Sequence, residues 1–274
     1  MAKTKVLITV KTYPAISGKY DELVCTAGFR EDGTWIRIYP IAFRKKSYDQ
    51  QYRKYDWIEI DLDKNTSDFR PESYRPHSLD GEINIVGHIG TENNWAERKG
   101  DVLRNVYVNL TELIAEAHDK RVCTSLAVFK PTNILDFTVE EVEREWDLKK
   151  IAKLEEERRQ MDLFKQPEDP FKVVNKLPYK FSYVIEDNEG RRSKMMIEDW
   201  EIGQLYWNCL ARYNGDEAKA VADVRKKYFD DFAKTKDLHL YLGTSQVHHY
   251  PSRNPFMIIG TFHPKVETQY SLFS

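Results

Sequence analysis

The chain has 274 residues, of which 41% are hydrophobic and 31% are charged, and its 42 Lys+Arg nearly cancel its 44 Asp+Glu. A formal net charge of -2 excludes proteins that bind nucleic acid or anionic membranes through their total charge, so any electrostatic footprint must come from local clustering. No apolar run approaches the ~20 residues of a spanning helix, and the start lacks the apolar segment of a signal peptide. We therefore expect a cytoplasmic protein that does not contact a membrane.

The three cysteines, Cys25, Cys123 and Cys209, are far apart in the sequence, and three thiols cannot all pair within one chain. Cys25 and Cys209 lie in apolar stretches, where a thiol behaves as a small buried hydrophobe. The pattern predicts buried free thiols and a reducing compartment.

The N-terminal part of the chain is dominated by segments typical of β-strands. Two apolar runs flank Glu31-Asp32-Gly33, a tight-turn sequence that predicts a hairpin. Residues 57–63 and 83–89 alternate apolar and polar side chains, so each predicts a strand with one buried and one wet face. Short strands at this spacing favour a small barrel or sandwich over a βαβ sheet.

The middle of the chain predicts a helix over 111–120 with Thr111 as its N-cap, and strands over 126–129 and 134–137. A long polar helix is expected to open at Thr138 and to continue through the charged stretch 155–160. The Pro-containing connector 166–170 would end it.

The C-terminal part predicts a strand over 179–185, amphipathic helices over 199–212 and 216–234, and strands over 238–242 and 256–262. We therefore predict a β-rich α+β fold with an N-terminal OB-like barrel and a C-terminal β-lobe that carries two packed helices. The predicted divisions are the barrel domain at 1–137, the charged helix and connector at 138–177, and the C-terminal lobe at 178–274.

No catalytic motif is recognisable. The sequence lacks HExxH, CxxC and Cys2His2 spacings, and adjacent His248 and His249 on a strand would point to opposite faces, which is poor chelating geometry. Its glycines form neither GxGxxG nor GxxxxGK, and a GxSxG elbow is absent. We expect no catalytic residue, no metal and no cofactor.

Acidic residues give a weaker alternative. Asp199 and Glu201 flank Trp200, with Lys194 nearby, as a magnesium-dependent nuclease would require. Asp199 also stands where a helix should begin, so an N-cap explains it. Asp61 and Asp63 share the outward face of one predicted strand, and a wet sheet face explains them.

Basic and aromatic residues interleave from Trp35 to Tyr55. Strand alternation places Trp35, Arg37 and Tyr39 on one face and two isoleucines on the other. Rings that stack on bases and a guanidinium that binds phosphate are what single-stranded nucleic acid requires. The candidate nucleic-acid-binding residues are therefore Trp35, Arg37, Tyr39, Arg44, Lys45, Lys46, Arg53 and Lys54, with Tyr13 as a further stacking candidate. A half-buried Trp35 and Tyr39 beside ordinary surface cations is the alternative.

The same residues support a resemblance. The segments 6–14, 24–28 and 33–40, together with 68–75, 178–183, 199–202 and 256–260, resemble the dual OB-fold domain family of uncharacterised prokaryotic proteins linked with antiphage and other conflict systems. The resemblance implies nucleic-acid binding by β-barrel modules and assigns no catalytic residue. Some relatives have Cys and His before the Asp-Trp-Glu helix, and 185–194 contains neither here, which argues against zinc.

We therefore expect a protein that binds DNA or RNA, as a recognition component of a prokaryotic defence system. Two alternatives stay open. One is a nuclease or nucleic-acid-modifying enzyme whose site gathers distant residues such as Asp199, Glu201, His248 and His249. The other is a protein-interaction subunit that docks a partner on the helix over 139–160.

Overall fold

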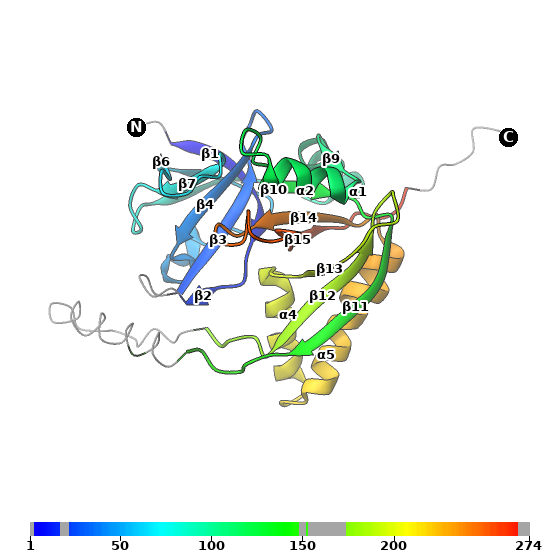
Figure 1. Ribbon diagram of the computed structural model, residues 1–274. Coiled ribbons are helices and arrows are strands. Elements are labelled where there is room, and N and C mark those ends of the chain that lie inside the picture. Colours follow the sequence, from blue (N-terminus) through cyan, green and yellow to red (C-terminus); the bar gives the residue numbers. More distant parts are fainter. Residues whose placement is uncertain (1–2, 17–21, 148–151, 153–173, 268–274) are drawn as a thin grey trace.

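The computed structural model describes residues 3–16, 22–147, 152 and 174–267. It has a curled N-terminal sheet in one half, and strands and helices that pack on one another in the other half (Figure 1). The β-rich α+β class predicted from the sequence is confirmed. None of the helices in the described part of the chain is both long and apolar enough to cross a membrane.

The N-terminal half is one eight-stranded sheet with the order β6-β7-β4-β3-β1-β5-β8, in which β2 also pairs with β3. Alternating apolar residues place one set of side chains inside the curl, where they form a buried cluster around Ile8, Ile36, Ile38 and Tyr52. The predicted hairpin at Glu31-Asp32-Gly33 is confirmed, and Gly33 takes the left-handed φ of +83° there. The strands and short 3-10 helices of this half are β1 (Thr4–Lys11), β2 (Ala15–Ile16), β3 (Glu22–Phe29), β4 (Trp35–Ile41), η1 (Phe43–Lys45), η2 (Tyr48–Gln50), β5 (Asp56–Ile60), β6 (Leu62–Lys64), β7 (Ser73–Pro76) and β8 (Ile83–His88).

The other half contains two further sheets. A four-stranded sheet has the order β15-β14-β10-β9, and a three-stranded sheet has the order β11-β12-β13. The elements that follow β8 are α1 (Glu92–Val102), β9 (Val106–Tyr107), α2 (Leu110–His118), β10 (Leu126–Phe129), β11 (Asn133–Glu141), β12 (Tyr179–Glu186), β13 (Arg192–Met196), α4 (Trp200–Arg212), α5 (Glu217–Arg225), a π-helical turn η4 (Lys226–Ala233), β14 (His239–Thr244) and β15 (Phe256–Phe262).

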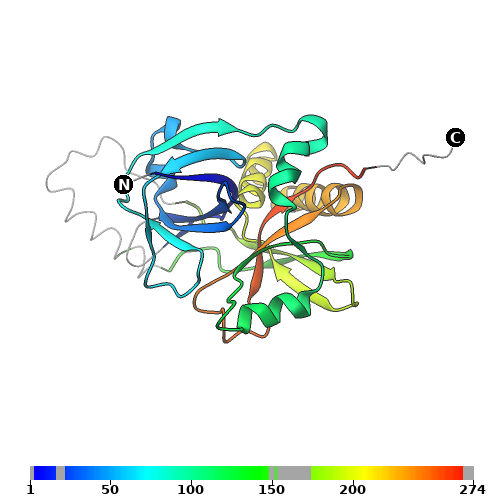
Figure 2. The same cartoon turned by 90° about the horizontal axis from the view of Figure 1, so that it is seen from above.

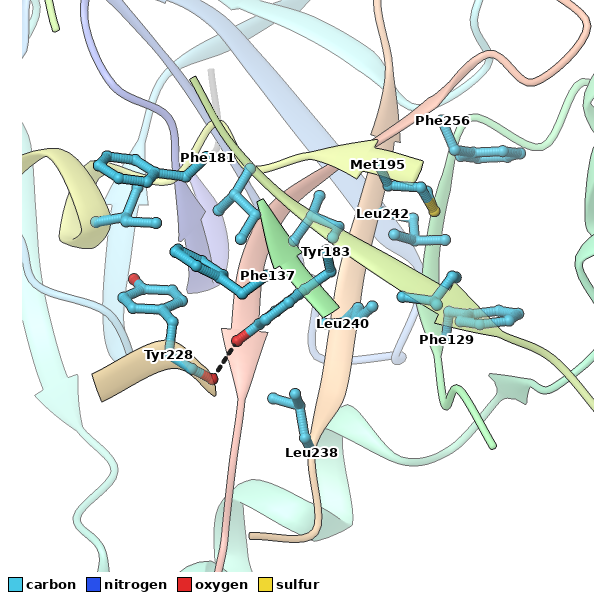
Figure 3. Packing of buried hydrophobic residues seen from close by; sticks show 14 of the residues in the cluster. Phe129, Phe137, Phe181, Tyr183, Met195, Tyr228, Leu238, Leu240, Leu242 and Phe256 are labelled. Carbon is cyan, nitrogen blue, oxygen red and sulfur yellow. Dashed lines mark hydrogen bonds between the residues drawn. The ribbon is translucent and has the colours of Figure 1, made fainter. Parts of the chain in front are cut away.

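The core of the C-terminal half lies between its sheets and the helices α4 and α5 (Figure 3). Phe137, Phe181 and Tyr183 project from β11 and β12 into this core, and the Tyr183 hydroxyl donates a 2.5 Å hydrogen bond to the carbonyl of Tyr228. These aromatic side chains are fully buried or nearly so. A separate buried cluster joins the outer face of the curled sheet to β10, β14 and β15. The two halves lie side by side in Figure 1 and in Figure 2.

Two local predictions are corrected. The helix expected to open at Thr138 is wrong, because Thr138 to Glu141 continue β11 and pair with β12; residues 142–147 are not helical either. The β-branched Thr138 and Val139 favour this pairing over the helix that the charged residues suggested. Most of the remaining predicted helix and the connector at 166–170 lie outside the described residues. The N-cap of α2 is Asn109, whose side chain accepts from the backbone N–H groups of Thr111 and Glu112, and not Thr111.

The predicted division between 137 and 138 falls inside β11. β10 also pairs with β14 across more than a hundred residues of sequence. Residues 126–137 thus share their sheets with C-terminal strands.

Candidate functional site

The other half covers Trp35 and Arg37 on the face of β4 that the sequence singled out, whereas Tyr39 on the same face stays exposed. Alternation is confirmed, since Ile36 and Ile38 fill the inside of the curl while Trp35 points the other way. The Trp35 ring packs 4.1 Å from the Phe29 ring and 6.1 Å from the Tyr241 ring, measured between centroids. The alternation of side chains along a strand predicts which side of the sheet each one faces. It does not predict whether solvent or another sheet covers that side.

Arg37 lies in this interface and is only 5% exposed. Its guanidinium donates to the carbonyls of Thr244 and Ser125, both at 3.1 Å, and it forms an ion pair with Glu72 at 3.5 Å. A buried guanidinium with these partners stabilises the contact between the halves. Arg37 therefore does not lie on the open strand face that the sequence predicted.

The remaining predicted residues divide into internal and surface groups. Lys54 has a side chain that is 8% exposed, and Lys46 donates to the carbonyls of Leu79 and Gly81, each at 2.7 Å. Tyr39 is 39% exposed and the Arg53 side chain is 74% exposed. Arg44 and Lys45, on η1, are also exposed.

The acidic residues of the nuclease alternative, Asp199 and Glu201, pair with Lys54 in the structure, and Asp199 caps α4. Asp199 is the predicted N-cap of α4, confirmed by the hydrogen bond that its carboxylate accepts from the Glu201 backbone N–H at 3.2 Å. The Lys54 ammonium lies 3.0 Å from the Asp199 carboxylate and 2.7 Å from that of Glu201. Burial raises the pKa of Asp199 to about 6, and the Lys54 charge opposes that rise.

The histidines of this alternative belong to another region. His249 is fully buried; its Nε2–H donates to the Ala117 carbonyl at 2.7 Å, so Nδ1 accepts from the Thr244 hydroxyl at 2.8 Å. His248, the preceding residue on the loop after β14, is exposed. Among the described residues, no three His, Cys, Asp or Glu side chains gather as metal ligands would.

A pocket of about 270 Å³ lies where the end of β1 and η1 meet α4. The backbone bridge between Thr12 and Asp199 brings these segments together. Three aromatic rings and one guanidinium face the same space. The lining residues are Tyr13, Pro14, Arg44, Val174, Asn175, Trp200, Gln204 and Trp207.

One stripe of α4 forms a wall of this pocket. Trp200, Gly203, Gln204 and Trp207 follow the spacing i, i+3, i+4, i+7, which aligns side chains along one helix face. Ile202, Tyr206 and Cys209 lie on the opposite face, in the core. The helix therefore has two apolar faces: one is buried in the core, and on the other Trp200 and Trp207 are partly buried against the core clusters and also line the pocket.

Gly203 lets Tyr13 lie against the helix. A Cβ added at this position would come within 2.3 Å of the Tyr13 ring, so only glycine permits the contact. The Trp207 indole donates to the Tyr13 hydroxyl at 2.7 Å, and that hydroxyl donates to the Asn175 carbonyl at 2.8 Å. These two hydrogen bonds hold the Tyr13 ring in a fixed orientation toward Trp207.

Further contacts fix Trp200. Its ring lies 5.4 Å from the Phe43 ring and 6.5 Å from the Tyr13 ring, between centroids. The Lys11 ammonium lies 4.6 Å from the Trp200 ring centroid and 4.0 Å from that of Phe43, a cation–π arrangement. Burial lowers the pKa of Lys11 to about 8, and the nearby Lys54 charge adds to this effect.

Two family models cover the chain. The first, Domain of unknown function (DUF8758), matches residues 2–104, and the second, Domain of unknown function (DUF8757), matches residues 108–274. The second match spans more than half of the chain. The chain belongs to the DUF8757 family. No curated protein matches it.

The pocket draws on both matched regions. Tyr13 and Arg44 come from the DUF8758 region, whereas Trp200, Gln204 and Trp207 come from the DUF8757 region. The Lys54–Asp199 ion pair also joins the two regions. The pocket wall thus depends on how the two regions dock.

A second pocket, of about 220 Å³, lies at the other side of the interface and includes Trp35, Glu72, Cys123 and Ser125 in its lining. Its charged lining group is the Glu72 carboxylate, which repels phosphate. The Cys123 thiol is 5% exposed, and burial raises its pKa. This arrangement favours neither an anionic ligand nor a reactive thiolate.

Of the residues that line the pocket, the sequence predicted Arg44 as a binding residue and Tyr13 as a further stacking candidate, and it did not single out Trp207. The predicted binding residues did not include Trp200 either. The overlooked feature is a glycine inside an amphipathic helix, flanked by tryptophans at i−3 and i+4. A glycine there costs about 1 kcal/mol of helix stability relative to alanine, so it indicates a close approach of another group.

Proposed function

We propose that this protein binds nucleic acid through the pocket between η1, the end of β1 and α4. The observation that supports the proposal most is the convergence of Tyr13, Trp200 and Trp207 with Arg44 on one space. Aromatic rings stack on bases and contribute about 1–3 kcal/mol per base. A guanidinium binds phosphate in a bidentate manner.

The charge distribution supports a nucleic-acid contact that involves few phosphates. The net charge of -2 provides no long-range attraction to a polyanion. Of the basic residues predicted to bind phosphate, Arg37 and Lys54 are engaged inside the protein. Affinity would therefore come from stacking together with few phosphate contacts around Arg44.

Three finer predictions belong to this proposal. The curled N-terminal sheet is taken as OB-like, and the role in a prokaryotic defence system implied by the resemblance stays a prediction. Exposed Lys45, which follows Arg44 in η1, and exposed Arg53 stay predicted phosphate contacts. The partner-binding helix over 139–160 lies largely outside the described residues, so the protein-interaction alternative also stays a prediction.

The test is a titration of fluorescein-labelled 12-mers, of single-stranded DNA and RNA, followed by fluorescence anisotropy. Trp207→Leu removes a pocket ring and keeps an apolar side chain. Trp57→Leu is the matched control, since Trp57 is a partly buried tryptophan on β5 that does not line the pocket. We expect Trp207→Leu to weaken binding at least tenfold and Trp57→Leu to bind as the parent does. Parent-like binding by both variants, or no binding by the parent, would overturn the proposal.

A further inference from the structure

The dimensions of the pocket bear on which form of nucleic acid it takes. Its volume of about 270 Å³ lies just below the roughly 300–1,000 Å³ of pockets that enclose a drug-sized ligand. A space of this size takes one base, whereas a base pair with its stacked neighbours is several times larger. The ring wall is also fixed, because Tyr13 is held by Trp207 and packs on Gly203.

A base inside a duplex cannot present itself to such a wall. Both of its faces are covered by neighbouring bases and its pairing edge is occupied, so entering a pocket requires unstacking and unpairing at a cost of a few kcal/mol. A base in a single strand, at a strand end or in a free nucleotide has no such cost. The pocket therefore favours unpaired bases over paired ones.

The polar lining fits a base that carries a phosphate. Arg44 is the one charged residue among those that line the pocket in the described part of the chain. Asn175 and Gln204 add amide groups at its wall, and the Gln204 amide nitrogen donates to Asn208 at 3.0 Å, which orients its carbonyl oxygen as an acceptor. One guanidinium allows about one phosphate contact at the pocket.

We propose that the pocket selects a single unpaired nucleobase, stacked on Trp200 and Trp207, with its attached phosphate on Arg44. This inference rests on the proposed function and narrows it. The ligand class is a nucleoside phosphate unit, whether it belongs to a single strand, to a strand end or to a free nucleotide. A blunt duplex is excluded from the class.

The experiment is a competition against a bound, labelled 12-mer single strand. The competitors are the unlabelled strand, a blunt 12-base-pair duplex, the same duplex with a three-nucleotide overhang, and adenosine 5′-monophosphate. We expect the single strand and the overhang duplex to compete at least tenfold better than the blunt duplex. If the monophosphate competes at a concentration within tenfold of that of the unlabelled strand, a free nucleotide is sufficient for binding. Failure of the monophosphate alone identifies a strand or strand end as the source.

Two outcomes separate this inference from the proposed function. If the blunt duplex competes as well as the single strand and Trp207→Leu still weakens both, the pocket binds nucleic acid but does not select unpaired bases, and the inference fails alone. If Trp207→Leu binds every ligand as the parent does, both fail. Circular dichroism of Trp207→Leu and Trp57→Leu confirms that loss of binding is not loss of fold.

Discussion

The Lys54 ammonium and the Asp199 carboxylate form an ion pair of 3.0 Å in which the lysine side chain is 8% exposed and the aspartate is fully buried. The pair links the loop before β5 to the first turn of α4, and therefore links the two regions that different family models match. Because α4 supplies Trp200 and Trp207, this pair sets the position of the pocket wall.

Removing one partner of this pair should destabilise the protein. Lys54→Met leaves the Asp199 charge buried without its counter-ion, and we expect a loss of about 3–5 kcal/mol in the free energy of unfolding. Asp199→Asn keeps an N-cap oxygen for α4 while it removes the charge. Urea denaturation of both single variants and the double variant forms a cycle, and we expect the double variant to lose much less than the sum of the two single losses. Additive losses would mean that the pair is not coupled.

Arg37 should matter for stability and not for ligand affinity. Arg37→Leu removes the hydrogen bonds to Thr244 and Ser125 and leaves Glu72 without its cation, so we expect a loss of about 3 kcal/mol. The dependence of log Kd on log salt concentration should keep the slope of the parent under conditions where the variant is folded. A reduced slope would show that Arg37 contacts phosphate after all.

Arg44 should account for a measurable part of the salt dependence. For single strands the slope changes by about 0.7 for each phosphate contact, so Arg44→Ala should flatten it by roughly that amount. Arg75→Ala makes the same charge change at an exposed position on β7 and serves as the control. Equal slopes for both variants and the parent would contradict a phosphate on Arg44.

Gly203 offers a test of pocket shape without removal of a ring. Gly203→Ala places a methyl group against Tyr13, so the ring must move and we expect roughly tenfold weaker binding. Gly100→Ala, in α1, meets no atom within 4 Å and should raise stability by up to about 1 kcal/mol with unchanged binding. Equal affinities for the two variants, measured by the same anisotropy titration, would show that the position of Tyr13 is irrelevant.

Acid should destabilise the fold through buried histidines. His263 stacks on Phe232 with ring centroids 3.7 Å apart, and burial lowers its pKa to about 4. As the pH falls below 6.5, His263 binds a proton in the unfolded chain, whereas in the folded state it binds one only near pH 4. The free energy of unfolding therefore decreases between pH 6.5 and pH 4, by up to about 3 kcal/mol. The pKa values of His239 and His249 are lowered by burial in the same direction. His263→Phe keeps a stacked ring and should flatten the pH profile of urea unfolding; an unchanged profile would contradict the assignment.

Much of the fold could be predicted from local patterns, because strand alternation and helix spacing are properties of neighbouring residues. The hairpin around Gly33 and the helix that begins after Asp199 are examples. The burial of Arg37 could not be predicted, since its partners Ser125 and Thr244 are 88 and 207 residues away along the chain. The pocket escaped prediction for the same reason, because Tyr13 and Trp207 are separated by 194 residues.

The central claim is that nucleic acid enters the pocket, and photocrosslinking tests it most directly. A single-stranded 12-mer that contains one 4-thiouridine is bound, irradiated and digested with the protein, and the crosslinked peptides are identified by mass spectrometry. We predict crosslinks to Tyr13, Trp200 or Trp207 that an excess of unlabelled strand suppresses. Suppressible crosslinks confined to other surfaces, such as exposed Tyr39 or Tyr48, would contradict the account.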